Sequence, residues 1–302
     1  MDMGASVIAR LKNKAKETGK PFQLHLQLFC QEEFLRRLAA SCYAENLVLK
    51  GGLFIYTLTN FESRATVDID FLLQQFPGRI EDIKRMVDEI ISVDSGNDFV
   101  TFNSRGFETI SPQRKYTGVS FQLVGQIKNT RTPFDVDFGV GDIIIPVPRK
   151  RTIPVQLDGF GAPEVLTYSL ESTIAEKFDA LLQRLELTSR MKDIYDIHYL
   201  SSIFDFDALR QAIFETLQNR GTAYERDSFD RVIALAGNKD IQVRWRQYLR
   251  RLKMTELPLE EVMVCIDRFL RPAWDAILSE GELFMRWDCK TATWHGEKKP
   301  VL

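Results

Sequence analysis

The stretch VLKGGLFIYTLTNFESRATVDIDFLL, residues 48–73, decides the fold and raises its main chemical question. Its last part, Val67–Leu73, alternates in polarity and then becomes wholly apolar, which predicts a central β-strand. This strand nevertheless carries two carboxylates, Asp68 and Asp70. A carboxylate is rarely buried unless it is paired or binds a metal ion. The stretch therefore predicts a functional site as well as a strand.

A second pair of carboxylates has the same spacing. Asp135 and Asp137 lie two residues apart in FDVDFG, as Asp68 and Asp70 do. Residues i and i+2 of a strand point to the same side of a sheet, roughly 6.6 Å apart. If the two strands are neighbours, the carboxylates converge and repel one another unless a cation neutralises them. Mg²⁺, or Mn²⁺, is the predicted cofactor because both ions prefer oxygen ligands.

A structural explanation of these aspartates stays open beside the metal site. They would then lie at strand ends, exposed or paired with Arg64 and Arg131. A single Asp-x-Asp most often has this meaning. Two such pairs on adjacent predicted strands favour the metal site. The structural explanation would require both pairs to avoid burial, because buried carboxylates without a partner are rare.

The two glycines suggest a phosphate-binding turn. Gly51 and Gly52 precede LFIYTL, which predicts a short helix. Glycine lets the backbone approach a ligand closely, and a helix N-terminus offers free N–H groups to an anion. Lys50 adds positive charge, and Arg64 and Thr66 either contact phosphate or order the loop before the strand. A plain tight turn is the commoner meaning of a Gly-Gly pair.

The chain divides into a mixed half and a helical half. Residues 1–165 predict an α+β domain with a mixed sheet and flanking helices, including Pro21–Glu45 and Arg79–Ser92. Residues 166–302 predict an α-helical domain. The final segment, CKTATWHGEKKPVL, has no periodicity and is predicted to be loose.

Bulk composition excludes several classes of protein. The net charge is -2, so nucleic-acid binding would require a local basic patch. The four cysteines form no Cys-x-x-Cys pair and the three histidines lie far apart, which argues against a structural zinc site. No signal-peptide run or membrane-spanning stretch is evident. We therefore expect a cytoplasmic protein without a membrane partner.

The helical half carries charged residues at helical spacing. Lys177 in AEKFDA, and Asp193 and Asp196 in SRMKDIYDI, predict salt bridges between two helices. Ile241–Lys253 has an apolar stripe flanked by arginines, which predicts an amphipathic helix with solvated flanks or, alternatively, a face that contacts RNA. The basic run at residues 148–152 predicts a solvated loop, with phosphate contact as the alternative.

Five motifs in order, LKGG, RATVDIDF, DFGVGD, AEKFDA and SRMKDIYDI, resemble the AbiEii/AbiGii toxin family of nucleotidyltransferases, within the DNA polymerase β-like group. The resemblance extends from FLRRLAASCYAENLVLKGG to about Leu200 and is weak in the last hundred residues. It implies a helical domain that completes the active-site cleft. It also implies transfer of a nucleoside monophosphate from an NTP to an acceptor such as RNA or tRNA, with release of pyrophosphate. The chain would be the toxin of a toxin–antitoxin or abortive-infection system, with a cognate antitoxin as a further partner.

The resemblance also implies roles for the first three motifs. Gly51 and Gly52 would bind the triphosphate, and Asp68 and Asp70 would bind the metal. The third carboxylate belongs to a D-x-x-x-G-D pattern, which fits here from Asp137 to Asp142. Asp137 is therefore assigned to the metal, and the contribution of Asp135 stays open. The sequence departs from the family at Leu53, where a small hydroxyl residue often follows the glycines.

In the last two motifs, the resemblance implies that Lys177 holds triphosphate oxygens, and that Asp193 orients this lysine or helps to activate the acceptor. A salt bridge that positions a catalytic lysine would satisfy both explanations, and a contribution from Asp196 stays open. Three other functions remain at this point. They are a nucleotidyltransferase that modifies a small molecule such as an antibiotic, a non-catalytic nucleotide-binding or partner-binding module, and another metal-dependent phosphotransferase.

Overall fold

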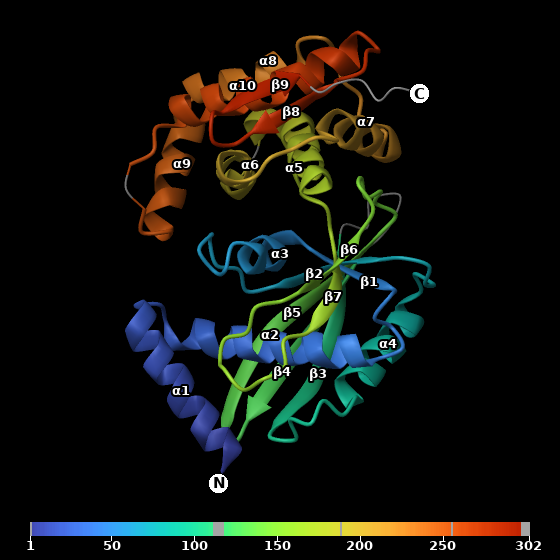
Figure 1. Cartoon of the computed structure of the whole chain (residues 1–302), viewed down its shortest axis with the longest axis vertical. Helices are drawn as coiled ribbons and strands as arrows, with labels where there is room; N and C mark the ends of the chain where they lie inside the picture. Colours follow the sequence, from blue (N-terminus) through green and yellow to red (C-terminus); the bar gives the residue numbers. More distant parts are fainter. Residues whose placement is uncertain (1, 111–117, 188, 255, 297–302) are drawn as a thin grey trace. The chain divides into compact units, whose positions relative to one another are not determined.

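The computed structural model describes residues 2–110, 118–187, 189–254 and 256–296. The chain forms two compact units, drawn in Figure 1. The first comprises Met1–Gly141 and Pro148–Tyr168, and the second comprises Asp142–Val147 and Ser169–Leu302. The short segment Asp142–Val147 thus packs with the helical unit, so a single boundary in the sequence does not separate the two units.

The first unit is built on a mixed seven-stranded sheet, in the order β3-β4-β5-β2-β1-β7-β6. Parallel pairs join β2 to β5 and β1 to β7, and the other pairs are antiparallel. The strands are β1 (Leu47–Lys50), β2 (Ile69–Leu73), β3 (Val100–Ile110), β4 (Gly118–Ile127), β5 (Thr130–Val140), β6 (Arg149–Thr152) and β7 (Glu164–Thr167). The helices are α1 (Met3–Thr18), α2 (Phe22–Ala40), α3 (Gly51–Leu58) and α4 (Ile80–Ser92). The mixed sheet predicted from the sequence is confirmed.

Helix α2 covers the apolar face of this sheet and crosses the strands in Figure 1. Phe34 of α2 packs on Phe71 of β2, which stacks on Phe138 of β5. Polar residues of α2 tolerate burial because they neutralise one another: buried Glu33 lies 3.1 Å from both Arg36 and Arg37. Since side chains alternate along a strand, the neighbours of these phenylalanines point to the opposite face.

The second unit consists mainly of helices, with α5 packed against α6, α7 and α8. Its elements are α5 (Leu170–Arg184), α6 (Met191–Ile203), α7 (Leu209–Arg220), α8 (Ser228–Ala234), α9 (Lys239–Arg251) and α10 (Leu259–Leu278), with the hairpin β8 (Met285–Asp288) and β9 (Thr293–Gly296). Phe178 of α5 makes edge-to-face contacts with Phe229 and Trp274, which form the aromatic centre of the unit. The helical character predicted for this part of the chain is confirmed.

The structure corrects three predictions of local structure. Strand β2 begins at Ile69 instead of Val67, so Asp68 precedes the strand. The basic run predicted as a solvated loop forms the edge strand β6, which pairs with β7. The segment predicted to be loose contains β9, held to β8 by antiparallel pairing and by the buried Trp287, while residues 297–302 lie outside the described part. The last two segments form strands because each pairs with a neighbouring strand, which the local pattern does not reveal.

Within the described ranges, no helix combines the length and the apolar character that crossing a membrane requires.

Candidate active site

The register of the sheet brings the predicted site residues of the first unit into one row. Asp70 of β2 lies opposite Asp137 of β5, and Lys50 of β1 lies opposite Asp70. On the other side, Ser120 of β4 lies opposite Asp137 and donates a hydrogen bond of 2.5 Å to its Oδ1. We call Lys50, Asp70, Asp137 and Ser120 the central row. Two strands distant in sequence thus place their carboxylates side by side.

Gly51 brings the N-terminus of α3 against Asp70. A Cβ atom at Gly51 would lie 2.0 Å from Oδ2 of Asp70, closer than any real contact. Gly51 also has a φ of 69°, in the left-handed region that favours glycine. Helix α3 begins at this residue, and the side chain of its N-cap, Lys50, accepts no hydrogen bond from the first turn. The free N–H groups of the first turn therefore lie beside a carboxylate of the central row.

A hydroxyl group from another segment lies beside the glycine turn, whereas Leu53 carries none. Leu53 is buried in the core of the first unit, where its side chain contributes to packing. A Cβ atom at Gly52 would lie 2.7 Å from Oγ1 of Thr66, in the loop before β2. The glycine turn thus has a hydroxyl next to it, although the residue that carries it lies fourteen positions after Gly52.

The carboxylates around Asp137 repel one another. The pKa of Asp137 is raised to about 6, mainly by burial and also by the charges of Asp70, Asp68 and Asp135, against the hydrogen bond from Ser120 that lowers it. The carboxylates of Asp70 and Asp135 form no hydrogen bond or ion pair with a described residue. Asp68 and Asp135 line a hollow next to the central row. Asp70 and Asp135 therefore carry negative charge that no described side chain neutralises by a hydrogen bond or an ion pair.

A divalent cation fits this donor set. The half-buried carboxylates of Asp70 and Asp137, with Asp68 beside them, offer the hard oxygen ligands that Mg²⁺ and Mn²⁺ prefer. The ligand atoms of the sheet carboxylates do not lie as close together as those of a compact metal site. In the described part of the chain, three potential ligand atoms lie within 4.8 Å of one another only at Asp205, Asp288 and Cys289.

The other predicted binding residues of the first unit, Lys50, Arg64 and Thr66, lie in different surroundings. The ammonium group of Lys50 lies 4.9 Å from the centre of the Tyr168 ring, in a cation–π contact. Arg64 and Thr66 are half-buried in the loop between α3 and β2. The structure brings Thr66 to the glycine turn and Lys50 to the central row, and it leaves Arg64 in the loop. The catalytic and binding roles of these residues remain predictions.

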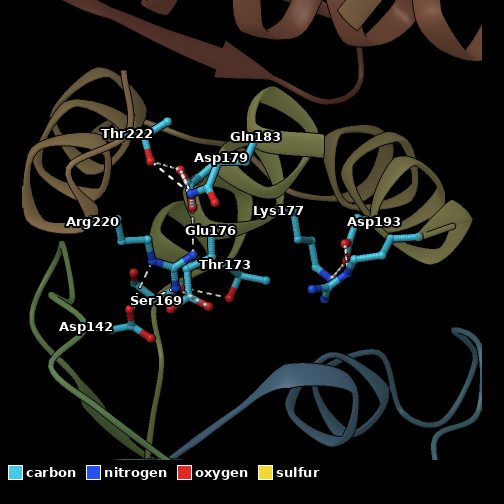
Figure 2. A network of polar contacts seen from close by, with 11 residues as sticks. Asp142, Ser169, Thr173, Glu176, Lys177, Asp179, Gln183, Asp193, Arg220 and Thr222 are labelled. Carbon is cyan, nitrogen blue, oxygen red and sulfur yellow. Dashed lines mark hydrogen bonds and ion pairs between the residues drawn. The ribbon is translucent and has the colours of Figure 1, made fainter. Parts of the chain in front are cut away.

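In the helical unit, Lys177 of α5 joins two buried aspartates of α6. Its Nζ lies 3.1 Å from Oδ1 of Asp193 and 2.7 Å from Oδ2 of Asp196, and Figure 2 shows Lys177 pointing toward Asp193. Both carboxylates are buried, and Arg190 Nε lies 2.5 Å from Asp193. The spacing of the two motifs thus leads to an interhelical ion pair in which Asp196 takes part as well as Asp193. The contribution of Lys177 to catalysis remains a prediction.

A second cationic centre of the helical unit, Arg220, is absent from the sequence prediction. Arg220 ends α7 and lies 2.8 Å from Asp142, 2.9 Å from Asp179 and 3.4 Å from Glu176. Figure 2 shows its side chain among these residues. Burial opposes the charged form, but the charges of Glu176, Asp142 and Asp179 prevail and raise the pKa of Arg220 above its usual value. Thr222 and Gln183 donate further hydrogen bonds to Asp179.

Arg220 connects two of the recognised motifs. Asp142 is the last residue of DFGVGD, whereas Glu176 and Asp179 belong to AEKFDA on α5. The carboxyl end of the D-x-x-x-G-D pattern therefore packs in the helical unit, and Asp137 stays on β5 in the first unit. No local signal marks Arg220, which is separated from Asp142 by 78 positions, although Gly221 in the left-handed conformation marks the end of its helix.

Comparison with known proteins identifies the family. The family model described as nucleotidyl transferase AbiEii toxin, Type IV TA system, matches residues 33–280. Among solved structures, a candidate nucleotidyltransferase from Helicobacter pylori is 15% identical, covering 84% of this chain and 96% of its own, with a TM-score of 0.42. JHP933 from Helicobacter pylori is 14% identical, covering 83% of this chain and 91% of its own, with a TM-score of 0.45. No curated protein matches the sequence.

Proposed function

The chain belongs to the AbiEii family of nucleotidyltransferase toxins of Type IV toxin–antitoxin systems, and we propose that its central row is the reaction centre. The proposed reaction transfers a nucleoside monophosphate from an NTP to an acceptor and releases pyrophosphate. The attacking and leaving oxygens of such a transfer lie roughly in line with the phosphorus, so catalysis depends on positioning and on charge stabilisation.

One observation carries this proposal: Gly51 leaves no room for a Cβ atom beside Asp70. Two elements with opposite preferences meet at this point, because the N–H groups of a helix N-terminus attract anions and a carboxylate attracts cations. An NTP with a divalent cation satisfies both at once, since its phosphates accept from the N–H groups and its cation binds the carboxylate. Neither feature alone would distinguish this site from a tight turn or a surface aspartate.

In the first unit, we assign one set of residues to the triphosphate and another to the cation. Gly51 and Gly52 present backbone N–H groups to the triphosphate, with Lys50, Arg64 and Thr66 as further contacts. Asp68, Asp70 and Asp137 would hold the cation, which supplies charge stabilisation for the attacking and leaving oxygens when it is bound. Asp137 also receives the hydrogen bond of Ser120, which fixes the orientation of its carboxylate.

In the helical unit, we assign Lys177 to the triphosphate and Asp193 to its orientation. The support is the geometry of the ion pair: the lysine is held by two buried carboxylates, so its position is fixed before substrate arrives. Asp196 holds the same ammonium group at 2.7 Å and acts as a second positioning residue.

We also propose an acceptor and a protein partner, neither of which the family match specifies. RNA is the proposed acceptor, supported by the exposed arginines of α9, Arg246, Arg250 and Arg251, opposite a face buried through Trp245. Such a basic face suits phosphate contacts and has no use in a transferase for small antibiotics. A cognate antitoxin is the proposed protein partner.

Incubation with each labelled NTP, Mg²⁺ and total bacterial RNA tests this proposal. We expect the wild-type protein to label RNA with one preferred NTP and to release pyrophosphate in equal amount. Asp70→Ala is expected to lower labelling by a factor on the order of 10³, because the charge stabilisation at the transition state is lost. Arg85→Ala, a change of an exposed residue on α4, is the matched control and is expected to label RNA as the wild type does.

Equal labelling by the wild type and Asp70→Ala would refute the proposed site. Labelling of a small molecule in place of RNA would refute the acceptor and leave the site intact. Binding of Mg·NTP without any release of pyrophosphate would favour a non-catalytic module.

A further inference from the structure

We propose that the hollow beside the central row binds the nucleotide unit of the acceptor that carries the attacking hydroxyl group. This inference rests on the proposed function, which it extends by assigning a place and a recognition residue to the acceptor. The hollow has a volume of about 300 Å³, at the lower end of the range for small-ligand sites. Its lining includes Asp68, Asp135, Gln122 and Arg105, all from the first unit.

The lining forms a second row across the sheet, parallel to the central row. Gln122 of β4 lies opposite Asp135 of β5, and Asp68 directly precedes β2 next to it. Asp68 and Asp135 each precede a member of the central row by two positions, and Gln122 follows Ser120 by two, so both rows lie on the same face. We call Arg105, Gln122, Asp135 and Asp68 the outer row.

Arg105 owes its place in the outer row to a β-bulge. The pairing of β3 with β4 shifts between Ser104 and Gly106, so Arg105 is an extra residue without a partner on β4. Gly106 has a φ of 155°, which side-chain-bearing residues rarely adopt. Bulges re-aim side chains and are common next to active sites. Here the bulge directs a guanidinium group to the hollow.

The guanidinium group of Arg105 is available to a ligand. It forms no hydrogen bond or ion pair with a described residue, although Asp68 and Asp135 line the same hollow. An arginine matches a phosphate group with two parallel hydrogen bonds. The amide of Gln122 can donate to and accept from a base or a ribose, and the ring of Pro133 adds apolar contact area. A nucleotide unit, either at the end of an RNA chain or free, combines these chemical groups.

The order of the two rows agrees with the geometry of the reaction. The triphosphate-binding turn at Gly51 abuts Asp70 of the central row, whereas the hollow adjoins Asp68 and Asp135 of the outer row. In-line displacement requires the acceptor and the leaving pyrophosphate on opposite sides of the α-phosphorus. The acceptor hydroxyl oxygen bonds to this phosphorus, the bond to the bridging oxygen breaks, and pyrophosphate leaves with the electron pair. The hydroxyl proton is released to water.

Photocrosslinking tests the location directly. The probe is a single-stranded oligoribonucleotide with 4-thiouridine as its 3′-terminal residue, added to the full-length protein. We expect crosslinks in peptides that contain Gln122 or Pro133–Asp135. Arg105→Ala is expected to lower the yield about tenfold, because a charge-assisted contact to phosphate is lost. The control Arg85→Ala removes an exposed arginine of α4 and is expected to leave the yield unchanged.

Competition with free uridine 5′-monophosphate distinguishes the two sources of a nucleotide unit. Displacement by micromolar to millimolar mononucleotide would indicate that the hollow accepts the free form, and resistance to it would indicate recognition of the RNA chain. Crosslinks confined to other peptides, a yield that Arg105→Ala does not lower, or no crosslinking at all would overturn the proposal.

Kinetics separates this proposal from the proposed function. With total RNA as acceptor, Arg105→Ala and Gln122→Ala are expected to raise the KM for RNA several-fold and to leave the KM for NTP unchanged. A fall in kcat with both KM values unchanged would contradict a binding role. If the wild type crosslinks in the hollow but transfers no nucleotide, the proposed function fails while the binding site stands.

Discussion

The carboxylates of the sheet and those of the helical unit differ in what neutralises them. In the helical unit, Asp193 and Asp196 meet Lys177. The three carboxylates of Asp142, Glu176 and Asp179 meet Arg220. In the sheet, Asp70 and Asp135 form no hydrogen bond or ion pair with a described residue. Both regions gather negative charge. Only in the helical unit do these carboxylates form ion pairs with a cationic side chain.

This difference separates structural charge from functional charge. A buried carboxylate that must stay in place is paired within the fold, because an unpaired buried charge costs several kcal/mol. The sheet carboxylates are half-buried, so solvent lowers that cost and leaves the site open to an external cation. The helical pairs position side chains, and the sheet cluster is where we expect the cation to bind.

The largest expected difference is in the free energy of unfolding of two variants, each of which replaces an arginine. Arg220→Met should lower the free energy of unfolding by about 3–5 kcal/mol, because three carboxylates lose their shared cation. Arg105→Met should change it by less than about 0.5 kcal/mol, since this exposed guanidinium has no described partner. Denaturant unfolding of both variants measures the difference. Equal losses of stability would remove the contrast between the two units.

A smaller effect is expected at two glycines with nearly the same φ angle. Gly51 and Gly19 have φ values of 69° and 67°, but a Cβ atom at Gly19 would meet no atom within 4 Å. Gly51→Ala should cost about 2–4 kcal/mol, as the strained φ and the clash with Asp70 add. It should also abolish nucleotide transfer, whereas Gly19→Ala should lose about 1–2 kcal/mol and keep activity.

Thermal unfolding and the RNA-labelling assay check the glycine pair. Retained transfer in Gly51→Ala would show that the close approach of α3 to Asp70 is dispensable.

The smallest expected effect concerns pH. The folded-state pKa of Asp137, about 6, exceeds its ordinary value of 3.8, so the native protein binds more protons than the unfolded chain between these values. The wild type should therefore lose stability as pH rises from about 4 to 6. Asp137→Asn removes this loss and should stabilise the metal-free protein at pH 8 by about 1 kcal/mol after allowance for solvent screening.

The stabilisation by Asp137→Asn should vanish below pH 4, where the carboxyl is protonated in both states. Denaturant midpoints across pH 3–8 with a chelator present measure it. A variant less stable than the wild type at pH 8 would show that the sheet carboxylates are already neutralised within the fold.

The sequence predicts those parts of this account that depend on short-range spacing. The spacing of Asp135 and Asp137 places them on one strand face, and Gly51 before an apolar run predicts the start of α3. The family resemblance then orders these motifs. The mixed sheet follows from strands rich in apolar and β-branched residues.

What the sequence does not reveal depends on distant pairing. Arg220 becomes central only after α7 packs against α5, and Arg105 reaches the hollow only through a bulge in the register of β3 and β4. The hydroxyl of Thr66 lies next to Gly52 only because the loop before β2 returns to the glycine turn. None of these contacts leaves a periodic signal along the chain.

Titration of the nucleotide-free protein with Mn²⁺ at pH 8, followed by electron paramagnetic resonance of the free ion, shows whether the sheet carboxylates bind a cation. The wild type should bind Mn²⁺, and Asp70→Asn should lose this binding. Asp205→Asn, which alters the other carboxylate group with close ligand atoms, should bind as the wild type does. Undiminished binding by Asp70→Asn, or loss of binding in Asp205→Asn, would contradict the assignment of the cation to the sheet.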